Sequence, residues 1–105
     1  MSKRNNDKPE WLTEDIEYLF KAMLKIQTKN DCEKFLRDLL TISEIKTLSE
    51  RLRIANLLNN GYTYKEIEKI TGTSSTTIAR TNRWLEYGEG GYKLILKRLK
   101  APRKY

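Results

Sequence analysis

The sequence predicts an all-α protein of six helices that contains a helix-turn-helix. Apolar side chains recur three or four positions apart through most of the chain, capping residues precede these stretches, and no segment shows the alternating pattern of a strand. The length of 105 residues suits one helical domain, predicted over residues 11–100 between a disordered N-terminal arm, 1–10, and a basic tail, 101–105. Because only 38% of the residues are apolar, the core is modest and association with a second copy is favoured.

Caps and apolar stripes predict the first three helices. Thr13 caps a helix that runs to about Gln27. Asn30, with Glu33 three positions later, resembles a capping box and starts the second helix. Thr41 starts a long third helix that ends at residues 59–61. The stripe of this helix that we expect to be buried is Ile45, Leu48, Leu52, Ala55 and Leu58.

The fourth and fifth helices form the predicted helix-turn-helix, at about residues 64–86. Thr63 and Glu66 form a capping box for a short helix that stops at Gly72, and Ser74 caps the next helix over residues 75–87. Gly72 can adopt the positive φ of a sharp turn. The side chains expected to meet behind the turn are Ile67, Ile70 and Ile78. A last helix is predicted over residues 92–100.

The net charge of +7 is concentrated near the C-terminus. From Ser74 onward the chain has eight cationic side chains and two carboxylates. Such a bias favours an anionic partner such as nucleic acid. A solvated basic end that keeps the protein soluble would have the same composition.

The sequence lacks the residues and motifs that enzymes, metal-binding proteins and disulfide-bonded proteins usually contain. There is no histidine, the one cysteine is Cys32, and neither a Gly-rich phosphate loop nor a nucleophile elbow is present. We therefore expect no enzyme activity, no metal site and no disulfide within the chain. No apolar run is long enough for a membrane span and the first residues lack a secretory signal, so we expect a cytoplasmic protein with no membrane contact.

The face of the fifth helix is predicted to bind DNA. Hydroxyl groups and the helix N-terminus suit phosphates, small side chains allow close approach to base edges, and arginine can bind guanine or a phosphate. The predicted DNA-binding residues are Lys65, Ser74, Ser75, Thr76, Thr77, Ala79, Arg80 and Arg83. The alternative is that these residues only build a corner between two packed helices.

Two blocks of sequence resemble the tryptophan repressor family, most closely its tryptophan-repressor-like branch. They are LLTISEIKTLSERLRIANLL at residues 39–58 and EIEKITGTSSTTIARTNRWL at residues 66–85, within a resemblance that covers residues 35–96. The resemblance implies an intertwined all-helical homodimer of bacterial type that presents two recognition helices to successive major grooves of a near-palindromic operator.

The resemblance also implies a ligand pocket, whose two arginines would be Arg51 and Arg80. Thr81 stands where the tryptophan-sensing branch has a small residue, and Trp84 is large enough to fill the cavity of a free tryptophan. We therefore expect no L-tryptophan corepressor and no other cofactor, and the sequence identifies no small-molecule effector. Trp84 can equally be an ordinary core residue, and Arg51 a solvated helix charge paired with Glu50.

Taken together, the sequence predicts a dimeric, sequence-specific regulator of transcription, a repressor, that binds double-stranded DNA. The alternative function is a helical interaction module whose basic end binds RNA or an acidic protein. Salt dependence and preference for one duplex over random DNA distinguish the two.

Overall fold

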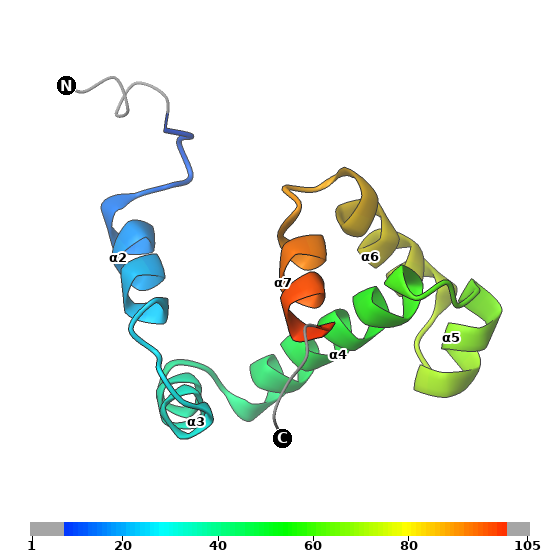
Figure 1. Cartoon of the computed structure of the whole chain (residues 1–105), viewed down its shortest axis with the longest axis horizontal. Helices are drawn as coiled ribbons and strands as arrows, with labels where there is room; N and C mark the ends of the chain where they lie inside the picture. Colours follow the sequence, from blue (N-terminus) through cyan, green and yellow to red (C-terminus); the bar gives the residue numbers. More distant parts are fainter. Residues whose placement is uncertain (1–7, 101–105) are drawn as a thin grey trace. The chain divides into compact units, whose positions relative to one another are not determined.

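The computed structural model describes residues 8–100, and over these residues the chain consists of six α-helices without a strand, as predicted. Most of the predicted N-terminal arm and all of the basic tail lie outside the described residues. The helices are α2 (Glu14–Met23), α3 (Lys29–Leu39), α4 (Ile42–Asn59), α5 (Tyr64–Thr71), α6 (Ser75–Tyr87) and α7 (Gly91–Lys100) (Figure 1). Between residues 8 and 100, no helix has both the length and the apolar character needed to cross a membrane.

Contacts divide the chain at Thr41 into two compact units. The first contains α2 and α3, and the second contains α4 to α7. The region predicted as one domain therefore comprises two units.

In the first unit, α2 begins as predicted and ends early. The Thr13 hydroxyl accepts an N–H of the first turn at 3.2 Å. The helix ends at Met23, although the sequence predicted that it continues to about Gln27. The reason is a tighter turn, in which the N–H groups of Lys25 and Ile26 bond to carbonyls only three residues back, at 3.0 and 3.2 Å.

The predicted start of α3 at Asn30 is wrong by two residues. Thr28 is the cap, and its hydroxyl accepts the Asp31 N–H at 3.0 Å, which places Asn30 inside the first turn. The carboxylate of Glu33 pairs instead with the ammonium of Lys29 at 2.5 Å. This exposed hydrogen bond raises the pKa of Lys29 and lowers the pKa of Glu33.

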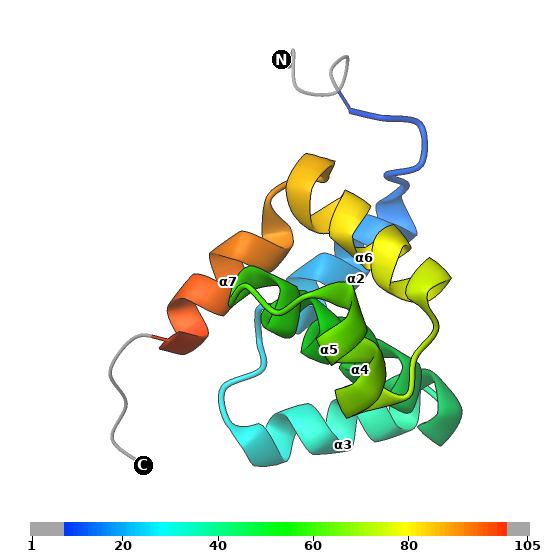
Figure 2. The same ribbon diagram turned by 90° about the vertical axis from the view of Figure 1, so that its right-hand side faces the viewer.

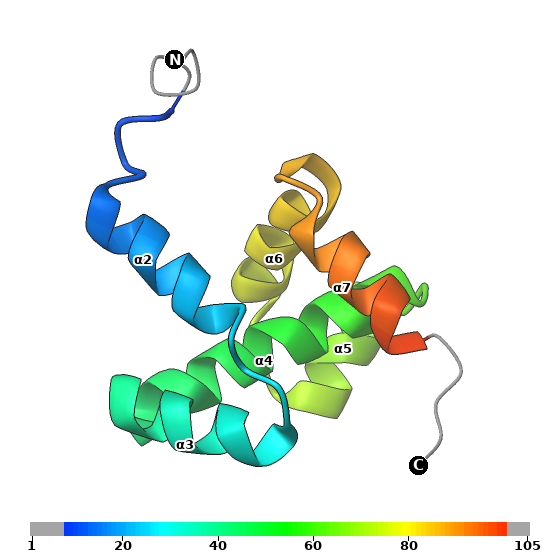
Figure 3. The ribbon, with the colours of Figure 1, turned by 60° about the vertical axis from the view of Figure 1, so that its left-hand side comes forward.

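In the second unit, α4 contacts α5, α6 and α7 and runs through the middle of the group (Figure 3). Figure 2 shows the short connection between α5 and α6. The core lies where α4, α5 and α6 meet, at the fully buried side chains of Ile54, Ile67 and Ile78. Leu57 and Leu58 pack against it. This cluster attaches the predicted helix-turn-helix to α4.

The predicted burial of two apolar stripes needs correction. Leu48 and Leu52 of α4 are 46% and 37% exposed, and Ile70 of α5 is 44% exposed. The buried residues of α4 are Ile54 and Ala55. The cause is that α4 has apolar side chains around much of its circumference, and α5 and α6 cover only the face that bears Ile54.

Candidate nucleic-acid interface

The turn between α5 and α6 has the geometry that the sequence predicted. At the start of α5, Thr63 and Glu66 form a reciprocal capping box with bonds of 3.1 and 2.8 Å. At its end, Gly72 is left-handed, with φ 73° and ψ 8°, and donates its N–H to the Glu68 carbonyl at 2.8 Å. A side chain at this φ would be strained, so glycine is the residue that permits the turn.

The first turn of α6 is capped by Ser74, as predicted. Its hydroxyl accepts the Thr77 N–H at 3.3 Å and donates to the Thr77 hydroxyl at 3.2 Å. Within the turn, the Thr73 N–H donates to the Thr71 hydroxyl at 3.1 Å. Ser74 and Thr77 therefore stabilise the helix start in addition to any contact that they make with a partner.

One side of α6 packs on the protein and the other is exposed. The buried residues are Ile78, Thr81 and Leu85. The first turn carries no acidic residue. All of the predicted DNA-binding residues are exposed in the single chain, namely Lys65, Ser74, Ser75, Thr76, Thr77, Ala79, Arg80 and Arg83. The arrangement presents hydroxyl groups, a methyl group and guanidinium groups on one helix that begins at a sharp turn.

The cationic side chains of α6 and α7 differ in their hydrogen-bond and ion-pair partners. In the part of the chain that the structure describes, the charges of Arg80 and Arg83 are in no ion pair. Lys93 of α7 lies 3.7 Å from the carboxylate of Glu86. Lys100 donates to the side-chain oxygen of Asn60 at 2.5 Å, which joins the ends of α7 and α4. Two of the cations of α7 thus have a structural role, whereas the arginines of α6 remain available.

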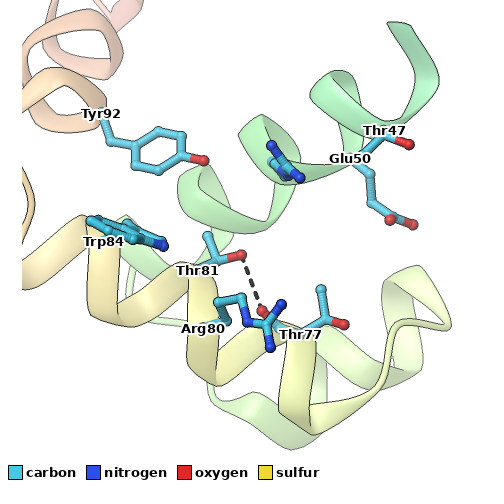
Figure 4. A pocket seen from close by; sticks show the side chains of 8 residues that line it. Thr47, Glu50, Thr77, Arg80, Thr81, Trp84 and Tyr92 are labelled. Carbon is cyan, nitrogen blue, oxygen red and sulfur yellow. Dashed lines mark hydrogen bonds between the residues drawn. The ribbon is translucent and has the colours of Figure 1, made fainter. Parts of the chain in front are cut away.

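A pocket of about 570 Å³ lies between α4, α6 and the start of α7 (Figure 4). It brings together Arg51 and Arg80, the two arginines that the family resemblance placed at a ligand site. The residues that line it are Thr47, Glu50, Arg51, Thr77, Arg80, Thr81, Trp84 and Tyr92.

Trp84 does not fill this pocket, contrary to what the sequence suggested. Its side chain borders the pocket and is 60% exposed, because it lies on the open side of α6. Thr81 is only 5% exposed, and its hydroxyl donates to the Thr77 carbonyl at 3.1 Å. The exposure of Trp84 also means that it is not an ordinary core residue in the single chain.

The position of Glu50 was not predicted from the sequence. One alternative was that this carboxylate pairs with Arg51, but among the described residues neither of these side chains is in an ion pair. Glu50 instead accepts a hydrogen bond from the Thr73 hydroxyl at 3.4 Å and lines the pocket. The available signal was its position four residues before Ile54, which puts both side chains on one face of α4.

Comparison with known proteins agrees with this arrangement. Residues 14–100 match the family model described as Trp repressor protein. The uncharacterized protein YerC of Bacillus subtilis is 41% identical over 86 residues, which are 82% of this chain and 83% of that protein. A Trp operon repressor homolog of Xylella fastidiosa is 37% identical over 66 residues, 62% of this chain and 72% of that protein.

The fold is shared with a solved structure. The crystal structure of a TrpR-like protein from Eubacterium eligens superposes with a TM-score of 0.82 at 38% identity, covering 91% of this chain and all of that chain. The match of the family model extends through all six helices that the structure describes. The chain belongs to the Trp repressor family and is a DNA-binding transcription regulator, not an enzyme.

Proposed function

We propose that the protein is a sequence-specific repressor that binds a near-palindromic operator as a homodimer. The observation that carries the proposal is the exposed first half of α6, which follows the left-handed Gly72 and begins at the Ser74 cap. A helix that starts this way, with no acidic residue in its first turn, has the shape and charge to enter a major groove.

Each exposed residue has a role that its chemistry suits. Ser75 and Thr76 lie in the first turn, whose N–H groups suit a phosphate oxygen. Arg80 and Arg83 reach base edges or phosphates, and Lys65 on α5 neutralises a phosphate. Ala79 permits close approach because its side chain is small. DNA lies in the cytoplasm of a bacterial cell, and we propose that the protein acts there.

Exposed apolar side chains support the homodimer. In the first unit, Trp11 and Leu24 are 60% and 84% exposed. In the second, Leu48, Trp84 and Leu94 are 46%, 60% and 49% exposed. Apolar surface of this extent on a small chain is typical of an association surface. Two copies related by a twofold axis would present two α6 helices to symmetric half-sites.

We further propose that no amino-acid corepressor is needed. Glu50 lines the pocket beside the two arginines, and its negative charge opposes the carboxylate of a free amino acid. Thr81, which the resemblance places where the tryptophan-sensing branch has a small residue, and the large side chain of Trp84 line the α6 side of the pocket. Calorimetry with L-tryptophan is the direct test of this proposal.

The experiment that tests the proposed function is selection of duplexes from a random pool with the purified full-length protein. We expect a recovered palindrome whose half-sites are about one helical turn apart, and about 10³-fold preference over random DNA. Affinity is expected to fall steeply with salt. Recovery of no common sequence, together with binding to RNA or to an acidic protein, would instead support the interaction-module alternative.

A further inference from the structure

We propose that Glu50 is a positioning residue of the helix-turn-helix: its carboxylate, bound by the Thr73 hydroxyl, fixes the start of α6 relative to α4. The two residues are 23 positions apart in the sequence, and the Thr73 oxygen lies 3.4 Å from the Glu50 carboxylate oxygen. This bond joins α4 directly to the turn. The proposal rests on the proposed function, because the position of α6 matters through its contact with DNA.

The helix-turn-helix is also attached to α4 through apolar contacts. They include the cluster of Ile54, Ile67 and Ile78, which stabilises the fold without a strong directional preference. Glu50 precedes Ile54 by four residues and therefore lies on the same face of α4, nearer to the connection between α5 and α6. A hydrogen bond is directional, so it adds to these apolar contacts an orientational restraint at the start of α6.

Thr73 is itself held firmly enough to transmit this restraint. Its N–H donates to the Thr71 hydroxyl at 3.1 Å, and that hydroxyl donates to the Ile67 carbonyl at 2.7 Å. Thr73 lies between the left-handed Gly72 and the cap residue Ser74. A restraint on its side chain therefore acts on the cap of α6.

The contacts of the carboxylate favour this role over a simple charge pair. Glu50 and Arg80 line the pocket from α4 and α6 (Figure 4), and Arg51 is a further lining residue. Within residues 8–100 no ion pair joins Glu50 to either guanidinium. Its observed partner is the Thr73 hydroxyl. The restraint thus bridges α4 and the helix-turn-helix in the chain without any ligand.

The test uses substitutions at both ends of the bond. Thr73→Val removes the hydroxyl at nearly constant shape, and Thr73→Ser restores it. Glu50→Ala removes the acceptor, and Glu50→Gln keeps an acceptor oxygen without the charge. The matched control is Thr47→Val, since Thr47 lines the same pocket but its hydroxyl bonds to the Ser43 carbonyl at 3.1 Å, within α4.

The first readout is amide hydrogen exchange of the free protein. We expect Thr73→Val and Glu50→Ala to speed exchange at the Thr77 and Ile78 amides by about threefold to tenfold, which corresponds to a modest hydrogen bond. Thr73→Ser, Glu50→Gln and Thr47→Val are expected to leave these amides unchanged. Unchanged exchange in Thr73→Val would overturn the proposal, whether or not the protein binds an operator.

The second readout is the ratio of operator affinity to random-DNA affinity. Thr73→Val and Glu50→Ala are each expected to lower this ratio by about threefold to tenfold, and the double variant by no more than either one. The ratio is the correct measure because loss of the Glu50 charge strengthens all DNA binding alike. Additive losses would show that the residues act separately. If the wild-type protein prefers no duplex, the proposed function is refuted. The hydrogen-exchange measurement would still test whether the bond between Glu50 and Thr73 restrains the start of α6.

Discussion

The Ser74 hydroxyl makes two hydrogen bonds with Thr77, accepting the backbone N–H at 3.3 Å and donating to the side-chain hydroxyl at 3.2 Å. Both residues are also predicted to face DNA. Their hydroxyl groups therefore stabilise the helix that they expose, and stability and binding must be measured separately at these positions.

Ser74→Ala is expected to lower the free energy of unfolding by about 1 kcal/mol, because the cap of α6 is lost. Urea denaturation monitored by circular dichroism measures this change. Ser75→Ala is the control, since Ser75 is exposed and follows the cap, and its effect should stay within about 0.5 kcal/mol. Equal effects of the two substitutions would mean that the cap contributes nothing.

Ile54→Ala is expected to destabilise the protein by about 3 kcal/mol, since it opens a cavity in the buried cluster beneath the helix-turn-helix. Ile70→Ala, at a position that is 44% exposed, should change stability by less than about 1 kcal/mol. Chemical denaturation of both variants at one protein concentration compares them. A larger loss for Ile70→Ala would indicate that another copy of the chain covers this side chain.

Arg83→Ala is expected to weaken binding to the selected operator by about tenfold while changing random-DNA binding much less, because Arg83 lies on the exposed face of α6. Lys97→Ala on α7 should weaken both kinds of duplex slightly and equally, through loss of one general phosphate attraction. Fluorescence anisotropy at several salt concentrations distinguishes these outcomes. The same modest loss on both duplexes for Arg83→Ala would rule out base recognition by this residue.

Leu48→Asp tests the proposed dimer. The burial predicted from the sequence implied that this substitution unfolds the protein, but Leu48 is 46% exposed in the single chain. We expect a folded helical protein with a weakened dimer, because the charge is introduced into an association surface. Sedimentation velocity with circular dichroism reports both properties. Ser43→Asp, at an exposed polar site of α4, is the control and should keep the mass of the wild type.

Titration with L-tryptophan is expected to give no saturable heat in the micromolar range, and operator affinity should be the same with and without the amino acid. The reason is the Glu50 carboxylate, which lines the pocket beside the two arginines and opposes the carboxylate of the amino acid. If heat is observed, Arg51→Ala locates the binding: its loss in this variant would establish a corepressor site between Arg51 and Arg80.

Local signals determined most of the secondary structure. The caps at Thr13, Thr63 and Ser74 and the left-handed Gly72 were readable from the sequence, because each depends on residues within four positions of itself. The start of α3 was predicted wrongly because Asn30, with Glu33 three positions later, has the pattern of a capping box, whereas the cap is Thr28, two residues earlier, whose hydroxyl accepts the Asp31 N–H.

Burial and long-range pairing were decided by the tertiary structure alone. Apolar residues surround much of α4, so only the placement of α5 and α6 determines that Ile54 is buried and Leu48 is not. Likewise, no periodicity predicts that Glu50 bonds to Thr73, 23 residues away, and leaves the adjacent arginine unpaired within the described chain. Sequence patterns report which residues can cap or pack within one helix, whereas the choice among equally apolar or equally polar partners depends on how the helices are placed in space.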